Sequence, residues 1–248
     1  MKAGVFDSGI GGLTVVKSLL ENKIFEEIIY FGDTARVPYG VKDKNTIIRY
    51  SLDAIEFFKN FDIDILIVAC NSVSAYALNE MRQNTTIPVV GVIESGIKAL
   101  KDKVKDKNSN ILVIGTKATI NSNRYESALT KLEYKNIYSI ATGLFVPIVE
   151  EDIFDGEILN AAMYHYFKNL SQIDVVILGC THFPLIEEKI SKYLNNALTM
   201  HSGDAIVDFL KVEYHCISRF NKTKIKFFAS ENPEGLKQVA KKWLKGLI

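Results

Sequence analysis

The sequence predicts an α/β protein made of two similar, doubly wound α/β domains. Short apolar runs alternate with longer amphipathic stretches along its 248 residues, which is typical of strands and helices that follow one another in parallel sheets. The run Ile-Leu-Ile-Val-Ala at 65–69 is apolar throughout, which indicates a strand buried on both faces. A sequence frame that occurs once in each half indicates that the halves share one design and are pseudo-symmetric.

The expected strands are the short apolar runs rich in β-branched residues, at 3–6, 28–31, 65–69, 89–92, 111–114, 137–140, 175–178 and 225–229. The expected helices are the amphipathic stretches between them, at 13–22, 45–58, 73–81, 95–103, 123–131, 157–167, 185–195, 205–213 and 233–245. The first domain is expected at 1–95 plus 210–248 and the second at 96–209, because the last strand and helix follow the second unit and can return to complete the first domain.

The repeated frame ends each time in a cysteine. In the first half, Ile-Asp at 63–64 opens an apolar run that ends at Cys70-Asn71-Ser72. In the second half, Ile-Asp at 173–174 opens a run that ends at Cys180-Thr181-His182. Two thiols placed identically in two halves suit a pair of groups that takes a proton from one face of a carbon atom and returns it on the other.

Composition excludes several classes of partner. The 30 basic and 29 acidic residues leave a net charge of +1, which gives no electrostatic case for binding nucleic acid or an anionic membrane. No apolar run approaches the roughly 18 residues that span a bilayer, and the first strand is expected to begin almost at the N-terminus, without a signal peptide. Three cysteines do not indicate a disulfide framework, so the cytoplasm is the expected compartment.

Polar residues follow four of the expected strands directly, at Asp7-Ser8-Gly9, Cys70-Asn71-Ser72, Gly115-Thr116 and Cys180-Thr181-His182. Open parallel sheets bind ligands at the carboxyl ends of their strands, so these turns are expected to cluster there. A helix is expected after each cysteine, and its positive N-terminal end would lower the pKa of the thiol.

A single cysteine after an apolar strand is more often a small buried hydrophobic residue than a reactive group. The equivalent frames of Cys70 and Cys180 favour a function for both, whereas Cys216 has no such frame and is interpreted as structural or incidental. Asp7 can lie beside Cys70 and accept a proton, or it can cap the helix that begins near residue 13. His182 can serve Cys180 because imidazole titrates near neutral pH.

Cofactor and metal motifs are absent from the sequence. The turn Gly9-Ile10-Gly11-Gly12 departs from the dinucleotide pattern because Thr14 stands where the third glycine is required. The chain has no Walker A sequence and no C-x-x-C pair, so neither a cofactor nor a metal is expected. The segment 32–40, which contains Tyr39 and Gly40, suits either a surface turn or the binding of a small polar ligand.

These residues resemble the motifs of the glutamate racemases in the aspartate/glutamate racemase family. The matching segments occur in family order, span nearly the whole chain, and read Val-Phe-Asp-Ser-Gly-Ile-Gly-Gly (5–12), Gly-Asp-Thr-Ala-Arg-Val-Pro-Tyr-Gly (32–40), Val-Ala-Cys-Asn-Ser (68–72) and Leu-Gly-Cys-Thr-His-Phe-Pro-Leu (178–185). One departure is Ser72, where the family usually has threonine, but serine keeps the hydroxyl group.

The resemblance implies a cofactor-independent racemase that interconverts L- and D-glutamate and supplies D-glutamate for peptidoglycan. It implies an active site in the cleft between the two domains, a homodimer, two acid/base thiols at Cys70 and Cys180, and assistance from Asp7 and His182. The substrate contacts that it implies are Asp7, Ser8, Tyr39, Gly40, Asn71, Ser72, Thr116, Thr181 and His182.

Two other functions are open at this stage. Aspartate racemases are similar and also use two cysteines, but they typically carry glutamate where this chain has His182, which favours glutamate as the substrate. A non-catalytic sensor that binds an amino acid on the same two-lobed fold is the alternative from another class, although it would not need both thiols.

Overall fold

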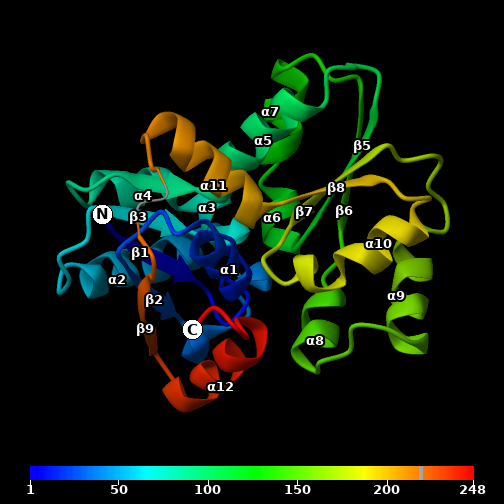
Figure 1. The fold of residues 1–248 in the computed structure, drawn as a ribbon. Helices are drawn as coiled ribbons and strands as arrows, with labels where there is room; N and C mark the ends of the chain where they lie inside the picture. Colours follow the sequence, from blue (N-terminus) through cyan, green and yellow to red (C-terminus); the bar gives the residue numbers. More distant parts are fainter. Residues whose placement is uncertain (218–219) are drawn as a thin grey trace.

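The computed structural model describes residues 1–217 and 220–248, and it contains two parallel β-sheets. The first sheet has the strand order β4-β3-β1-β2-β9, and the second has the order β6-β5-β7-β8. Figure 1 shows the two sheets in two halves of the molecule that lie side by side, each with its own helices. The predicted α/β fold with two doubly wound domains is confirmed.

The first sheet is covered by helices on both faces. Its strands are β1 (Lys2–Asp7), β2 (Glu27–Gly32), β3 (Ile65–Val68), β4 (Val89–Gly91) and β9 (Lys224–Ala229). Neighbouring side chains of β1 point to opposite faces, so Val5 packs in one core cluster and Phe6 in the other. The helices on the Val5 face include α1 (Leu13–Asn22) and α12 (Pro233–Trp243), and those on the Phe6 face are α2 (Lys44–Phe58), α3 (Asn71–Tyr76) and α4 (Leu78–Gln83).

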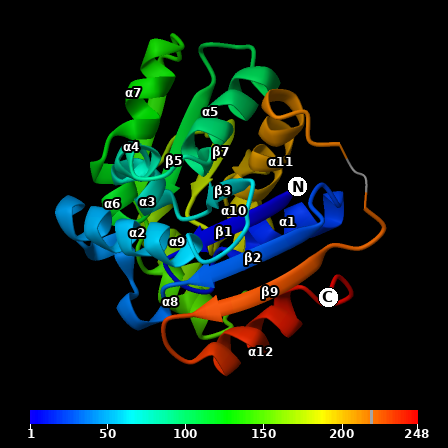
Figure 2. The same ribbon diagram turned by 90° about the vertical axis from the view of Figure 1, so that its left-hand side faces the viewer.

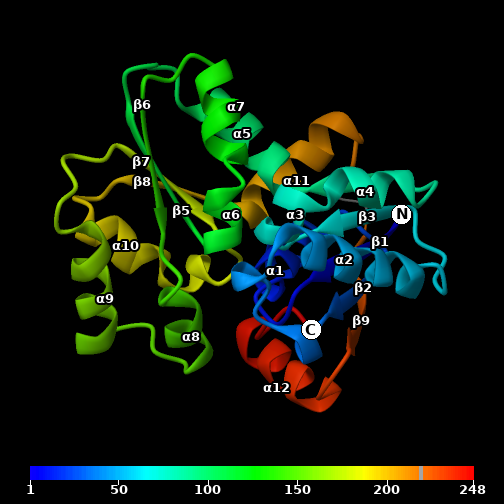
Figure 3. The same ribbon diagram turned by 180° about the vertical axis from the view of Figure 1, so that it is seen from behind.

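The second sheet repeats this arrangement. Its strands are β5 (Asn110–Gly115), β6 (Asn136–Ala141), β7 (Val175–Gly179) and β8 (Leu198–His201). One face packs against α8 (Phe145–Glu150), α9 (Glu157–Phe167) and α10 (Glu187–Tyr193), and α7 (Arg124–Lys131) packs against the other. The short helix α6 (Lys117–Asn121) follows β5 directly. Figure 3 shows these elements from behind, on the side opposite β9 and α12.

Two helices lie between the sheets and belong to both cores. Helices α5 (Val92–Lys103) and α11 (Ser202–Glu213) contact each other. In α5, Val92 packs in a core cluster of the first sheet, whereas Ile93 packs in one of the second. In α11, Ile206 packs in the core cluster of the first sheet and Ala205 in that of the second. The ranges given for the two domains therefore stay a prediction, because these helices connect them.

The C-terminal segment returns to the first sheet. Strand β9 pairs in parallel with β2, from Lys224 beside Glu27 to Ala229 beside Gly32. Figure 2 shows β9 along the edge of the sheet, with α12 below it. The expected return of the last segment to the first half is confirmed, and it covers an edge that would otherwise be open.

The sequence did not predict every element. Strand β8 was missed because its side chains are mostly half-exposed, so it has no apolar run. The helices α6 and α8 were missed because each is very short. The expected helix 73–81 is interrupted at Ala77, which separates α3 from α4. No helix of the described residues is both long and apolar enough to cross a membrane.

Candidate active site

A cavity of about 690 Å³ lies where the carboxyl ends of the central strands of both sheets meet. Both cysteines of the repeated frame line it, Cys70 after β3 and Cys180 after β7. Nearly all of the predicted substrate contacts also line the cavity, namely Ser8, Tyr39, Gly40, Asn71, Ser72, Thr116, Thr181 and His182. The structure therefore brings together groups that are distant in sequence and come from both halves.

Asp7 is the one predicted residue that does not line the cavity. Its side chain is fully buried behind the wall, where it accepts hydrogen bonds from the Gly9 amide at 3.0 Å and the Thr181 hydroxyl at 3.3 Å. Burial raises the pKa of this carboxyl group, while the nearby His182 acts in the opposite direction. The alternative that Asp7 caps α1 is wrong, because Gly12 is the N-cap residue and no side chain caps that helix.

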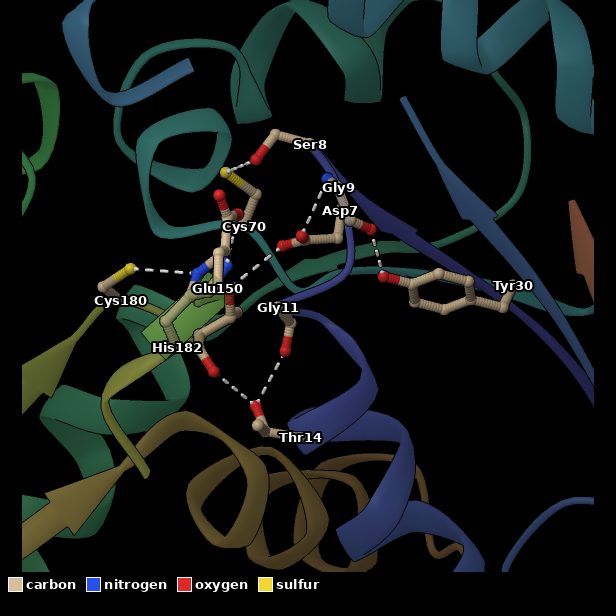
Figure 4. Close-up of polar contacts among 11 residues, drawn as sticks. Asp7, Ser8, Gly9, Gly11, Thr14, Tyr30, Cys70, Glu150, Cys180 and His182 are labelled. Atoms are coloured by element: carbon tan, nitrogen blue, oxygen red, sulfur yellow. Dashed lines mark hydrogen bonds and ion pairs between the residues drawn. The ribbon is translucent and has the colours of Figure 1, made fainter. Parts of the chain in front are cut away.

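Cys70 lies directly before α3 and is 6% exposed. Its Sγ donates a hydrogen bond to Ser8 Oγ at 3.6 Å (Figure 4). Burial raises the pKa of the Cys70 thiol to about 12, and the nearby charge of Asp7 adds to this increase. The expectation that the helix end would lower this pKa is wrong, because desolvation and a neighbouring carboxylate outweigh the favourable helix end.

Cys180 has different neighbours. Its Sγ lies 3.7 Å from His182 Nδ1, and His182 Nε2 lies 2.9 Å from Glu150 Oε1 at the end of α8 (Figure 4). Burial alone would lower the pKa of His182, but hydrogen bonds to Cys180 and Glu150 outweigh it and raise the pKa to about 10. The imidazole is therefore protonated at neutral pH and holds positive charge next to the Cys180 sulfur.

The segment after Cys180 also differs from its counterpart. The chain forms a 3₁₀ helix, η3 (Phe183–Ile186), and α10 begins only at Glu187. The expectation that an α-helix directly follows each cysteine is therefore confirmed for Cys70 and wrong for Cys180. In the second half a histidine side chain, rather than a helix end, supplies the positive charge at the thiol.

One wall of the cavity is a cluster of hydroxyl groups. Ser72 Oγ lies 3.0 Å from Thr116 Oγ1 and 3.4 Å from Thr119 Oγ1, and the two threonine oxygens are 3.2 Å apart. Gly40 packs so closely on Thr116 that an added Cβ would lie 2.5 Å from its Cβ. Ser72 and Gly40 come from the first half, so the wall joins the two halves.

The segment 32–40 is anchored rather than free at the surface. Asp33 is fully buried, and its carboxylate accepts hydrogen bonds from the Tyr39 hydroxyl and, at 2.7 Å, from the Ser230 hydroxyl. Arg36 Nε lies 2.6 Å from the same carboxylate. These contacts fix Tyr39 and Gly40 at the cavity, so the segment is more than a surface turn, and its binding of a small polar ligand stays a prediction.

Sequence reasoning missed several residues of the cavity. Glu150 is the most important, because its contact with His182 comes from a helix that the sequence pattern did not reveal. Thr119 and Lys117 at the start of α6 were missed for the same reason. An apolar part of the lining had no polar signal to identify it, and it comprises Val37, Pro38, Val41, Leu144, Val146 and Pro147.

Comparisons with known proteins identify the family of this chain. Residues 16–210 match the family model described as Asp/Glu/Hydantoin racemase. A glutamate racemase of a Nitratiruptor species is 61% identical over 246 residues, covering 99% of this chain and 97% of that protein.

Solved structures are similar over the whole chain. The crystal structure of glutamate racemase from Campylobacter jejuni subsp. jejuni is 54% identical, with a TM-score of 0.98 and full coverage of both chains. The glutamate racemase of Francisella tularensis subsp. tularensis in complex with D-glutamate is 35% identical, with a TM-score of 0.86, covering 98% of this chain and 93% of that chain.

Proposed function

The chain belongs to the Asp/Glu/hydantoin racemase family, and we propose that it interconverts L- and D-glutamate with Cys70 and Cys180 as the two bases. Racemisation of glutamate is the activity of its full-length relatives. The observation that carries the two-base mechanism is that one thiol from each half lines a single cavity. A substrate whose Cα lies between them presents its two faces to different sulfur atoms.

Neutral hydrogen-bonding groups provide most of the polar lining for the substrate. The hydroxyl cluster of Ser72, Thr116 and Thr119 can donate to a carboxylate, and Lys117 adds a positive charge at the same wall. Donors aimed at one carboxylate also stabilise the negative charge that develops on it when the Cα proton leaves. The remainder of the cavity lining is largely apolar, and this less polar environment strengthens these interactions.

In one direction Cys180 acts as the base and Cys70 as the acid. The protonated His182 stabilises a thiolate at Cys180, which removes the Cα proton and becomes a thiol. Cys70, whose raised pKa keeps it protonated, delivers its proton to the opposite face and becomes a thiolate. One proton leaves the substrate and one returns, so the charge on the pair of thiols is conserved.

The reverse direction starts from the state that the forward direction leaves behind. Cys70 is then the thiolate and removes a proton from the other enantiomer, while Cys180 donates. Asp7 is close enough for its charge to affect the pKa of Cys70, and the raised pKa of its own carboxyl group makes it a better proton acceptor. We infer that Asp7 assists Cys70 from behind the wall, as His182 assists Cys180 from within it.

The cellular role follows from the product. We infer that the D-glutamate enters peptidoglycan synthesis and that the enzyme works as a homodimer in the cytoplasm, without nucleic acid as a partner. The cytoplasm suits the mechanism because both thiols must stay reduced, and the structure has three free cysteines. No cofactor enters the proposed steps, because the protons are carried by side chains of the chain itself.

Substitution of each cysteine tests this proposal. We expect Cys70→Ser and Cys180→Ser to lower kcat for glutamate by about 10²–10⁴-fold, because a hydroxyl group is a far weaker base than a thiolate. Circular dichroism of the amino acid follows the conversion from either enantiomer. Cys216→Ser is the matched control, since Cys216 lies outside the cavity near Met1, and it should keep wild-type kcat.

Two results would contradict the proposal. Substantial racemisation by either active-site variant would show that the thiols are not both required. Faster conversion of aspartate than of glutamate by the wild type would show that the substrate is wrong.

A further inference from the structure

The residue after each cysteine is held by side chains from the opposite half of the molecule. Asn71 follows Cys70 in the first half, and it is buried, with 2% of its surface exposed. The Tyr125 hydroxyl, from α7 beside the second sheet, donates to Asn71 Oδ1 at 2.8 Å. Asn71 Nδ2 in turn donates to Ser202 Oγ at 3.3 Å, at the start of α11. Both ends of the Asn71 amide are therefore fixed by groups that follow strands of the second sheet.

The arrangement at Cys180 is reciprocal. Thr181 follows Cys180 in the second half. Thr14 Oγ1, from α1 of the first half, donates to the Thr181 carbonyl at 2.7 Å, which is nearer than the Gly11 carbonyl at 3.0 Å. The Thr181 hydroxyl donates to Asp7, also from the first half, at 3.3 Å. Gly11 permits this close approach, because a Cβ there would lie 2.4 Å from Thr181 Oγ1. The Gly9–Gly12 turn, which lacks the dinucleotide pattern, thus has a packing role.

These hydrogen bonds can control the direction in which each cysteine sulfur points into the cavity. The two sheets share no strand pairing among the described residues, so contacts of this kind fix one half against the other. Cys70 and Asn71 are consecutive, as are Cys180 and Thr181, so a small rotation at the second residue moves the sulfur of the first. A displacement of about 1 Å in a reacting group can cost about 10²-fold in rate.

Resting on the two-cysteine mechanism proposed above, we propose that Tyr125 and Thr14 are positioning residues for the two proton transfers. Tyr125 acts through Asn71 on Cys70, and Thr14 acts through Thr181 on Cys180. Neither residue lines the cavity, so neither is expected to touch the substrate. Each half of the molecule thus aligns the base that the other half carries.

The test uses Tyr125→Phe and Thr14→Val, each of which removes one hydroxyl group and keeps the shape of the side chain. Matched controls are Tyr134→Phe and Thr223→Val, whose buried hydroxyl groups donate to the carbonyls of Val104 and Phe25, away from the cavity. The measured quantities are kcat/KM and its primary isotope effect with Cα-deuterated L-glutamate and Cα-deuterated D-glutamate. Thermal unfolding of all variants shows whether the fold is kept.

Each variant should lower kcat/KM about tenfold, the scale of one buried hydrogen bond. The factor should be the same for both enantiomers, because the equilibrium constant of a racemisation is fixed at one.

The isotope effects on kcat/KM should separate the roles of Tyr125 and Thr14. Slowing one thiol makes its own proton transfer more rate-limiting, so the effect grows for the enantiomer that this thiol deprotonates and shrinks for the other. Tyr125→Phe and Thr14→Val should therefore shift the ratio of the two isotope effects in opposite directions. Thr14→Ser should restore the wild-type ratio, and both controls should keep it.

An unchanged ratio in both variants, or a shift in the same direction, would overturn the positioning role even if activity falls. Failure of the underlying mechanism looks different. In that case Cys70→Ser or Cys180→Ser would keep substantial racemisation, whatever Tyr125→Phe and Thr14→Val do.

Discussion

At the scale of single residues, the two thiols occupy equivalent positions but have opposite electrostatic surroundings. Cys70 lies near a carboxylate, Asp7, and Cys180 lies next to an imidazolium, His182. Burial and the negative charge of Asp7 keep the Cys70 thiol protonated, whereas Nδ1 of the protonated His182 lies 3.7 Å from the Cys180 sulfur. The two halves thus give the two thiols of one cavity different surroundings.

Glu150→Gln tests the role of the imidazolium. Glu150 is one of the groups that raise the pKa of His182 to about 10, so removing its charge should lower that pKa. In the proposed mechanism the protonated His182 is the active form, so activity should be lost as the pH rises through its pKa. We therefore expect the alkaline limb of the kcat/KM profile to move to lower pH in the variant.

The neighbouring Glu151→Gln is the matched control for this profile. Glu151 is exposed and does not line the cavity, so its neutralisation should leave the alkaline limb in place. An alkaline limb that stays at the wild-type pH in Glu150→Gln would show that Glu150 does not maintain the charge of His182.

At the scale of elements, the segment from β2 to η2 (Tyr39–Val41) is held by one buried carboxylate. Asp33 accepts hydrogen bonds from Tyr39 and Ser230 and pairs with Arg36. Ser230 follows β9, so the C-terminal segment supports a wall of the cavity that lies far from it in sequence. This link gives the return of β9 to the first sheet a consequence for the active site.

Asp33→Asn should therefore destabilise the protein, because it leaves the half-buried Arg36, the buried Tyr39 hydroxyl and the Ser230 hydroxyl without their charged partner. We expect a loss of about 3 kcal/mol in the free energy of unfolding by denaturant, together with a higher KM for glutamate. Asp53→Asn removes the other ion pair of Arg36, in which the Asp53 side chain is exposed to solvent. This variant should lower the free energy of unfolding by less than about 1 kcal/mol. Equal losses in the two variants would contradict the anchoring role of Asp33.

Sequence pattern predicted the elements whose signal is local. The apolar strands, the long amphipathic helices and the polar turns after Phe6, Ala69 and Gly179 are visible in the sequence because burial on both faces leaves a continuous apolar run. The half-exposed β8 and the short helix α8 leave no such pattern. Glu150 was missed with α8, since its contact with His182 depends on tertiary packing.

The raised pKa of the Cys70 thiol could not be predicted from the sequence either. The pattern suggested a helix end after the cysteine, and that helix is present. The pKa of the thiol depends instead on how completely the cavity wall is buried and on the distance to Asp7, which comes from a different strand. Local signals thus predicted where the site lies, and packing between elements decides its electrostatics.

At the scale of the whole molecule, two copies of one scaffold place two cysteines with different neighbours at one cavity. The repeated frame predicts the positions of Cys70 and Cys180, while the partners of each thiol differ between the halves. Helices α5 and α11 contribute side chains to the cores of both sheets, and this shared packing holds the two halves against each other. The central claim is that each thiol serves one face of the substrate.

The distribution of deuterium at early times in D₂O tests this claim most directly. Unlabelled L-glutamate and D-glutamate are each incubated with the wild type, and Cα deuterium is measured by mass spectrometry in the recovered substrate and in the product after a few per cent of turnover. Because the thiol that removes the proton differs from the thiol that supplies one, the product should carry solvent deuterium while the recovered substrate stays unlabelled. Product that keeps its original proton, or recovered substrate labelled as fast as product, would contradict the two-base mechanism.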